Sequence, residues 1–227
     1  MDNIFVLIGD GSLSGGEAYE GLNNAVEAGT NMIIIVNDNE MSIAENYGGL
    51  YKNLRELRET EGKSECNFFK AMGLDYRYVG EDSNHPVVVH VHTIKGKGYA
   101  PAETNKEQFH AGPPFDLKTG ETKVSFGGEN YSEITGEFLL DAMKNDPTVV
   151  AITSATAPVI GFMKERREQG GKQFVDVGIA EEHAVALSSG IAADGGKPVY
   201  GVYSTFLQRA YDQLSQDLCI NNNPALP

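Results

Sequence analysis

An acidic side chain lies in a glycine-rich stretch close to the N-terminus. Asp10 belongs to the stretch Gly9–Gly16, which follows the apolar run Ile4–Ile8 and precedes a helical pattern. The stretch is neither a dinucleotide fingerprint nor a Walker A loop, because Ser14 stands where the third glycine should be and Glu17 follows Gly16. Glycines and a helix N-terminus favour anions, but Asp10 repels phosphate unless a cation lies between them. Mg²⁺ fits, since it prefers carboxylates, waters and phosphates.

A second oxygen ligand follows the next expected strand. The apolar run Asn31–Val36 ends in the polar turn Asn37-Asp38-Asn39, and Asn39 carries an amide oxygen. Because open α/β sheets bind ligands at the carboxyl ends of their strands, we expect Asp10 and Asn39 to share one site. The alternative is that both are ordinary turns after strands.

The elements that position these residues fall into two groups. Between about residues 112 and 130 the sequence turns to Gly, Pro, Lys and Thr without periodicity, which indicates a linker. The fold class is therefore predicted as α/β, with two mainly parallel-sheet domains at residues 1–124 and 125–227. Expected first-domain strands are Ile4–Ile8, Asn31–Val36, Tyr76–Val79 and Val87–Ile94, with helices at Glu17–Ala28 (capped by Ser14) and at Asn53–Met72 (interrupted at Gly62). Expected second-domain helices are Ser132–Asn145, Glu181–Asp194 and Leu207–Cys219, with strands Val149–Thr153, Phe174–Val177 and Val199–Tyr203.

The two oxygen-bearing turns resemble a known motif. Gly9-Asp-Gly11 followed by Asn37-Asp-Asn-Glu-Met-Ser-Ile43 is similar to the thiamine-diphosphate motif of the transketolase superfamily, in the form used by deoxyxylulose-phosphate synthases. The resemblance implies two domains of the thiamine-diphosphate-binding type, both incomplete. It also implies site residues. Asp10, Asn39 and the Met41 carbonyl would hold Mg²⁺, and Gly11, Ser12, Asn39 and Met41 would contact the cofactor. Glu20 either faces the sheet and supports the site or is a surface carboxylate.

The stretches Thr93–Glu103 and Phe109–Asp116 resemble the end of the family's first domain. By this resemblance His110 faces the reactive carbon of the cofactor and transfers protons there. Lys97 either attracts a substrate phosphate or is a solvated lysine. His90 and His92 alternate on an expected strand, but its apolar neighbours favour a structural role over a metal pair.

Glu181 begins a predicted helix directly after a predicted strand. A carboxylate at this place is commonly only a partner of the helix dipole. The resemblance implies more, because the matching family glutamate bonds N1′ of the cofactor's aminopyrimidine and activates it. Tyr203 and Phe206 match aromatic residues that flank the pyrimidine, and Arg209 matches a cation near the substrate.

The resemblance covers nearly all of the chain, as a middle section of the family sequence. Only Gly80–Pro86 join two expected strands, whereas a parallel crossover needs a dozen residues or more. Either the strands are antiparallel, or a crossover helix is missing. The resemblance favours the second reading, with Val87–Ile94 parallel to Ile4–Ile8.

Composition limits the partners. The net charge of −14 disfavours nucleic acid, the apolar runs are too short to span a membrane, and no signal peptide is indicated. Two distant cysteines fit a cytoplasmic setting. The resemblance implies a homodimer and small-molecule substrates, pyruvate and glyceraldehyde 3-phosphate, joined to 1-deoxy-D-xylulose 5-phosphate. The alternatives are another transketolase-like enzyme and a silent fragment that needs a partner chain.

Overall fold

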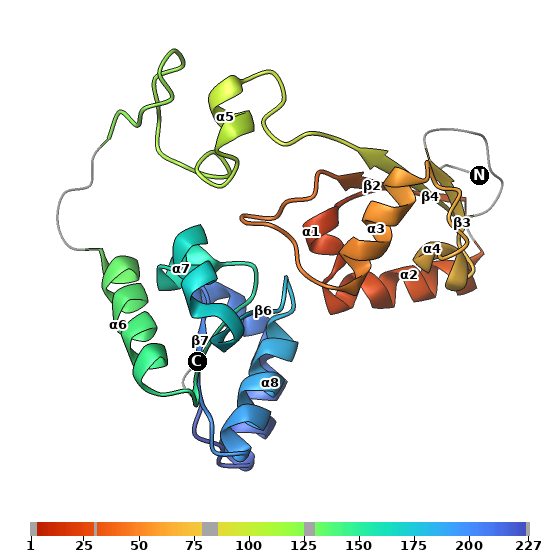
Figure 1. Cartoon of the computed structure of the whole chain (residues 1–227). Coiled ribbons are helices and arrows are strands. Elements are labelled where there is room, and N and C mark those ends of the chain that lie inside the picture. The colour runs from red at the N-terminus through yellow and green to blue at the C-terminus, as the bar shows by residue number, and fades with distance from the viewer. Residues whose placement is uncertain (1–3, 30, 79–85, 125–129, 226–227) are drawn as a thin grey trace. The chain divides into compact units, whose positions relative to one another are not determined.

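The chain forms two compact units, Met1–Val124 and Ser125–Pro227. The structure is a computed structural model that describes residues 4–29, 31–78, 86–124 and 130–225 (Figure 1). Both units are built from parallel sheets and helices, so the predicted α/β class is confirmed. Within the described residues no helix is long and apolar enough to span a membrane.

Unit 1 contains a four-stranded parallel sheet in the order β1-β2-β4-β3. Its strands are β1 (Ile4–Gly9), β2 (Met32–Asp38), β3 (Asp75–Tyr78) and β4 (Val87–His92). The parallel orientation expected for β4 and β1 is therefore confirmed. The interpretation of the β3–β4 link as a shortened crossover falls on residues 79–85, which lie outside the described residues.

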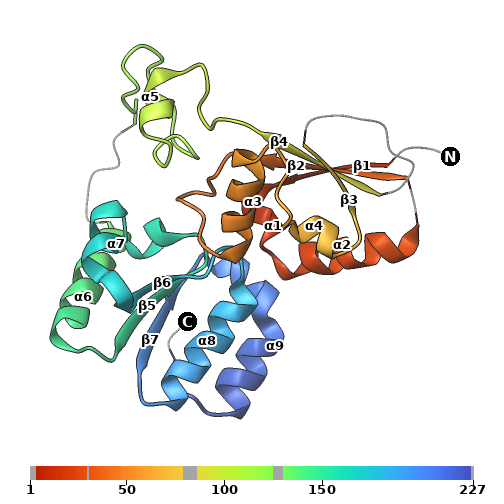
Figure 2. The ribbon, with the colours of Figure 1, turned by 45° about the vertical axis from the view of Figure 1, so that its right-hand side comes forward.

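Helices cover one face of this sheet. They are α1 (Asp10–Leu13), α2 (Gly16–Ala28), α3 (Gly49–Glu59) and α4 (Phe68–Ala71), with α5 (Ala100–Thr104) further along the chain. Figure 2 shows α2, α3 and α4 on the same side of the strands. Their apolar faces form one core with the sheet, in which Leu22, Leu54, Phe69, Val36 and Val88 are buried.

The cap expected for α2 was wrong, whereas the interruption expected at Gly62 is confirmed. Ser14 does not cap α2, which begins after Gly15; its hydroxyl instead donates to the Gly11 carbonyl at 2.9 Å. The expected helix Asn53–Met72 is two helices, α3 and α4, because Gly62 has φ +76° and the Asn67 side chain caps α4. The predicted end of α2 at Gly29 is confirmed, with φ +58°.

β1 is not the buried strand that its apolar composition predicts. Phe5 is 65% exposed and Leu7 73% exposed. The reason is position, because β1 lies at the edge of the sheet and the described helices pack on one face only. A run of apolar residues indicates a strand buried on both faces only where both faces are covered.

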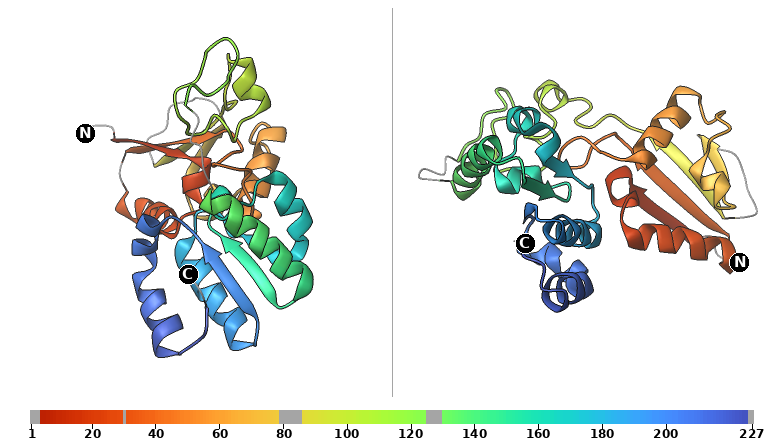
Figure 3. Two further views of the ribbon diagram at one scale, coloured as in Figure 1. Left: turned by 90° about the vertical axis from the view of Figure 1, so that its left-hand side faces the viewer. Right: turned by 60° about the horizontal axis from the view of Figure 1, so that its bottom comes forward.

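Unit 2 has three layers around the parallel sheet β6-β5-β7. Its strands are β5 (Val149–Thr153), β6 (Phe174–Asp176) and β7 (Lys197–Gly201). Helices α6 (Tyr131–Asn145) and α7 (Lys164–Gly170) lie on one side of the sheet, and α8 (Glu181–Ala193) lies on the other (Figures 2 and 3). Short 3₁₀ helices, η1 (Ala157–Ile160) and η2 (Gly171–Gln173), complete the connections. Two apolar clusters, one on each face of β5, form the core.

The helix expected at Leu207–Cys219 is irregular. It is a 3₁₀ helix, η3 (Ser204–Ala210), then one α-turn, α9 (Tyr211–Gln213), and a π-helix, η4 (Leu214–Ile220). The carbonyl of Asp217 accepts from the Ser189 hydroxyl at 2.7 Å. A side chain that inserts into the backbone ladder in this way favours departure from α geometry.

Candidate active site

Asp10 lies at the end of β1, where α1 begins, and is 1% exposed. Asn46 Nδ2 donates to its Oδ2 at 2.8 Å. Burial and the neighbouring Asp38 charge raise the pKa of Asp10 to about 6, against the lowering effect of backbone N–H groups at Gly11 and Asn39. Asp10 is therefore a buried carboxylate whose ionised form lacks sufficient compensating charge.

The turn after β2 brings Asn39 next to this carboxylate. Gly9 and Asn37 are paired between the two strands, so the residues that follow each strand meet at one edge of the sheet. Asn39 Oδ1 accepts from the Met41 N–H at 3.2 Å. An amide or carbonyl oxygen has two lone pairs, so this bond leaves Asn39 Oδ1 able to accept a further ligand.

These residues fit a hard divalent cation. Asp10, Asn39 and the Met41 carbonyl offer oxygen atoms only, as Mg²⁺ prefers. A cation beside Asp10 offsets the charge repulsion from Asp38 that raises the Asp10 pKa. In the part of the chain that the structure describes, no three His, Cys, Asp or Glu side chains form an alternative metal cluster.

A lysine that the sequence interpretation missed lies beside this site. Lys95 Nζ donates to the Ser42 carbonyl and lies 2.7 Å from His110 Nδ1. Burial lowers the pKa of Lys95, and the charge of Asp10 opposes this effect. Lys97, which the sequence interpretation named instead, is exposed. The signal for Lys95 was its place just after β4, where Thr93 N–H still bonds the Asp38 carbonyl at 2.8 Å.

His110 is held in one orientation by Lys95. Because an ammonium group only donates, Nδ1 of His110 accepts and Nε2 carries the proton. Partial burial and the Lys95 charge lower the pKa of His110. A neutral imidazole near pH 7 is the state needed to accept a proton.

Other residues named from the sequence have simpler places. His90 is fully buried, with Nε2 2.8 Å from Asp38 Oδ2 and Nδ1 2.7 Å from the Tyr76 hydroxyl, whereas His92 is exposed. His90 therefore belongs to a structural network. Glu20 is exposed on α2, so it is a surface carboxylate. Ser12 is exposed on α1.

Glu181 begins α8 in unit 2 and is 3% exposed. Burial raises its pKa, while the nearby Arg209 guanidinium lowers it. Arg209 donates to Glu181 Oε2 at 2.7 Å, and its other terminal nitrogen lies 3.6 Å from Glu182. The sequence assigned Glu181 and Arg209 separate tasks, and the structure pairs them.

Tyr203 and Phe206 form an aromatic pair at the start of η3. Their rings meet edge to face with centroids 5.6 Å apart, and Tyr203 is 50% exposed. The same short helix carries Arg209, so the pair and the Glu181 partner belong to one element. Exposed aromatic faces are suited to contact a flat ring.

Comparison with known proteins assigns both units. A sequence model described as 1-deoxy-D-xylulose-5-phosphate synthase matches residues 1–83, and a model of the transketolase pyrimidine-binding domain matches residues 129–226. A 1-deoxy-D-xylulose-5-phosphate synthase of Clostridium perfringens is 40% identical over 98% of this chain. One from Geobacter sulfurreducens is 38% identical over 99% of it. The chain belongs to the 1-deoxy-D-xylulose-5-phosphate synthase family.

The chain spans less than half the length of these relatives, 44% of the first and 43% of the second. The first alignment extends over 274 residues, more than the 227 residues of the chain. The family members therefore have residues inside the matched region without a counterpart here. A solved transketolase mutant of Pichia stipitis aligns with 15% identity and a TM-score of 0.36, over 97% of this chain and 46% of that one.

Proposed function

We propose that this chain supplies the cation and pyrimidine sites of a thiamine-diphosphate-dependent carboligase. The reaction joins two carbons of pyruvate to glyceraldehyde 3-phosphate, giving 1-deoxy-D-xylulose 5-phosphate and CO₂ for isoprenoid precursor synthesis. The observation that carries the proposal is Glu181, a buried carboxylate with a raised pKa at the head of α8, in the unit that matches a pyrimidine-binding domain.

In unit 1, Asp10, Asn39 and the Met41 carbonyl would hold Mg²⁺, which binds the cofactor's diphosphate. Gly11 and Ser12 would lie along that diphosphate. The acidic chain otherwise repels it, so the cation is needed for binding. His110, with Lys95 fixing its proton on Nε2, would transfer a proton at the reactive carbon of the cofactor.

In unit 2, Glu181 would hold a proton at N1′ of the aminopyrimidine, because its raised pKa favours sharing it. Tyr203 and Phe206 would flank that ring. Arg209 would orient Glu181 and offer its remaining donors to the substrate's anionic end. When bound, thiamine diphosphate supplies the carbon that attacks the keto acid and stores the electron pair after CO₂ leaves.

Two alternatives were open from the sequence. Another transketolase-like enzyme is not favoured, because the relatives at 35–40% identity are 1-deoxy-D-xylulose-5-phosphate synthases. A chain that works only with a partner polypeptide is the second alternative, and the comparison with these relatives does not favour it either. We further propose that the protein is cytoplasmic and forms a homodimer; light scattering would test the dimer, and cell fractionation the location.

The test is product analysis with Mg²⁺ and thiamine diphosphate. We expect 1-deoxy-D-xylulose 5-phosphate from pyruvate and glyceraldehyde 3-phosphate, and no transfer from xylulose 5-phosphate. Cofactor binding without turnover would favour the partner-dependent chain, and transfer from xylulose 5-phosphate would favour a transketolase.

A further inference from the structure

One arginine contacts both chain neighbours of Asn39. The two terminal nitrogens of Arg58 on α3 reach the carboxylates of Asp38 and Glu40, one nitrogen to each. The Arg58 side chain is 10% exposed and that of Asp38 is 1% exposed. A planar guanidinium presents its donors in a rigid fork, so these two contacts set the distance between Asp38 and Glu40.

The Asp38 end of this contact is itself fixed. Its Oδ2 also accepts from His90 Nε2 at 2.8 Å, and His90 is held by the Tyr76 hydroxyl at 2.7 Å. The same oxygen also accepts from Arg58, so a buried carboxylate oxygen is held by a guanidinium and an imidazole together. Asp38 is therefore a rigid, charged anchor in the core.

The backbone conformation of Glu40 has to be stabilised by contacts with other residues. Glu40 has φ +65°, a left-handed conformation that is strained for a residue with a side chain. Its N–H donates to Asp38 Oδ1 at 3.2 Å, and its carboxylate is held by Arg58. This conformation turns the chain, so Asn39 and Met41 depend on it for their direction.

We propose that Arg58 is a positioning residue for the cation site, holding the turn Asp38–Met41 so that the Asn39 amide and the Met41 carbonyl stay beside Asp10. The inference rests on the proposed function, because it assumes that these three residues bind a divalent cation. Arg58 itself does not touch the cation. Partners outside the ligand shell that orient the ligands commonly change metal affinity by about 10- to 100-fold when removed.

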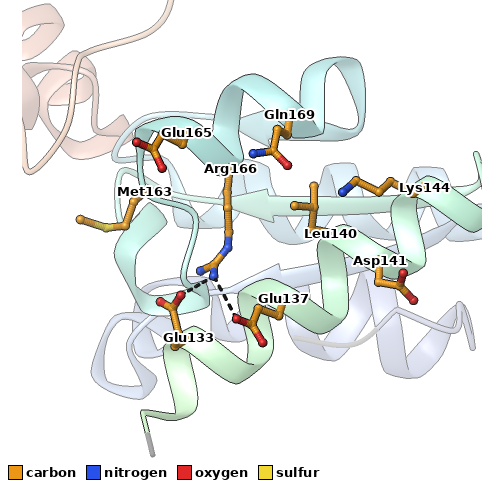
Figure 4. A pocket seen from close by; sticks show the side chains of 9 residues that line it. All are labelled: Glu133, Glu137, Leu140, Asp141, Lys144, Met163, Glu165, Arg166 and Gln169. Carbon is orange, nitrogen blue, oxygen red and sulfur yellow. Dashed lines mark hydrogen bonds and ion pairs between the residues drawn. The ribbon is translucent and has the colours of Figure 1, made fainter.

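Unit 2 contains a matched control. Arg166 also joins two carboxylates, Glu133 and Glu137, and its side chain is 16% exposed (Figure 4). Removing it breaks an ion pair of similar form with no part in the cation site. A merely stabilising role for Arg58 predicts the same behaviour for both arginines.

The experiment measures binding of Mn²⁺ alone by electron paramagnetic resonance, since Mn²⁺ accepts the same oxygen ligands as Mg²⁺. Wild type should bind Mn²⁺, and Asp10→Ala should not. Arg58→Gln should weaken binding about 10-fold or more, Arg58→Lys by less, and Arg166→Gln not at all. Glu40→Gln removes the charge at the partly exposed end of the same contact and should also weaken Mn²⁺ binding. It is the test to use if Arg58→Gln fails to fold.

The outcomes separate the two claims. Unchanged Mn²⁺ affinity in folded Arg58→Gln, or in Glu40→Gln, with affinity lost in Asp10→Ala, overturns the positioning role and leaves the cation site intact. A wild-type chain that binds no Mn²⁺ overturns the cation site, and the positioning role falls with it.

Discussion

Glu181 and Arg209 are partners in unit 2, with 2.7 Å between the carboxylate oxygen and the guanidinium nitrogen. Glu181 is buried and Arg209 is partly exposed. The arginine therefore opposes the rise that burial causes in the Glu181 pKa. Burial has the larger effect on the Glu181 pKa, and Arg209 partly offsets it before any ligand binds.

The first prediction follows from this pair. Arg209→Met keeps the apolar stem but removes the charge, so the Glu181 pKa should rise above its wild-type value. Carbon-13 NMR of glutamate carboxyls, assigned with Glu181→Gln, measures it. Arg166→Met is the control and should leave the Glu181 titration unchanged. A Glu181 midpoint that stays the same in Arg209→Met would show that the pairing has no electrostatic effect.

Asp10 makes the stability of the metal-free chain depend on pH. Its folded pKa of about 6 exceeds the usual 3.8, so its contribution to stability is full below pH 3.8 and lost as pH rises through 6. The loss is at most about 3 kcal/mol. Asp10→Asn should therefore be more stable than wild type at pH 8 and gain little at pH 4.

Urea unfolding at both pH values, followed by far-UV circular dichroism, gives this difference. Mg²⁺ should restore wild-type stability at pH 8 and leave Asp10→Asn unaffected. If Asp10→Asn raised the free energy of unfolding equally at pH 4 and pH 8, burial would not disfavour the ionised form of Asp10.

The Lys95 contact sets the charge state of His110. Lys95→Met should raise the His110 pKa, because the remaining lowering effect is partial burial alone. Histidine NMR, assigned with His110→Asn, records the titration. Lys97→Met removes an exposed lysine two positions along the chain and is expected to change nothing. If both lysine variants shifted the His110 pKa equally, the change in net charge, and not the contact between Lys95 and His110, would explain the shift.

Sequence reasoning found those features that depend on local order. The end of α2 at Gly29 and the strand β5 were predicted correctly in this way, whereas the parallel orientation of β4 was predicted from the family resemblance. Features that depend on residues distant in the sequence were not predicted. The exposure of β1 follows from which faces helices cover, and composition does not encode that.

The site shows the same division. The local pattern places Glu181 at the start of a helix after a strand, and the family resemblance singles it out as a site residue. Its partner Arg209 lies 28 positions away, and only the packing of η3 against α8 brings them together. Lys95 was missed because its partner His110 lies 15 positions away, beyond the short helix α5 and the irregular segments on either side of it.

A close backbone contact in unit 2 gives a stability prediction. A Cβ on Gly161 would lie 2.0 Å from the Ser132 carbonyl oxygen, and Gly161 has φ +70°. Gly161→Ala should lower the free energy of unfolding by about 3 kcal/mol or more, from strain plus overlap. Gly171→Ala has positive φ but open space, so roughly 1 kcal/mol is expected. Equal urea midpoints for these two variants would contradict the close contact.

The most direct test of the proposed role of Glu181 is deuterium exchange at C2 of thiamine diphosphate in the presence of Mg²⁺. Wild type and Glu181→Gln should bind the cofactor within a few-fold by calorimetry, because the change keeps shape and one hydrogen bond. Exchange should be faster in wild type than in Glu181→Gln by about 10²- to 10⁴-fold, since only the carboxylate holds the proton at N1′. Equal exchange rates in the two proteins would contradict the account and leave Glu181 a helix-capping charge.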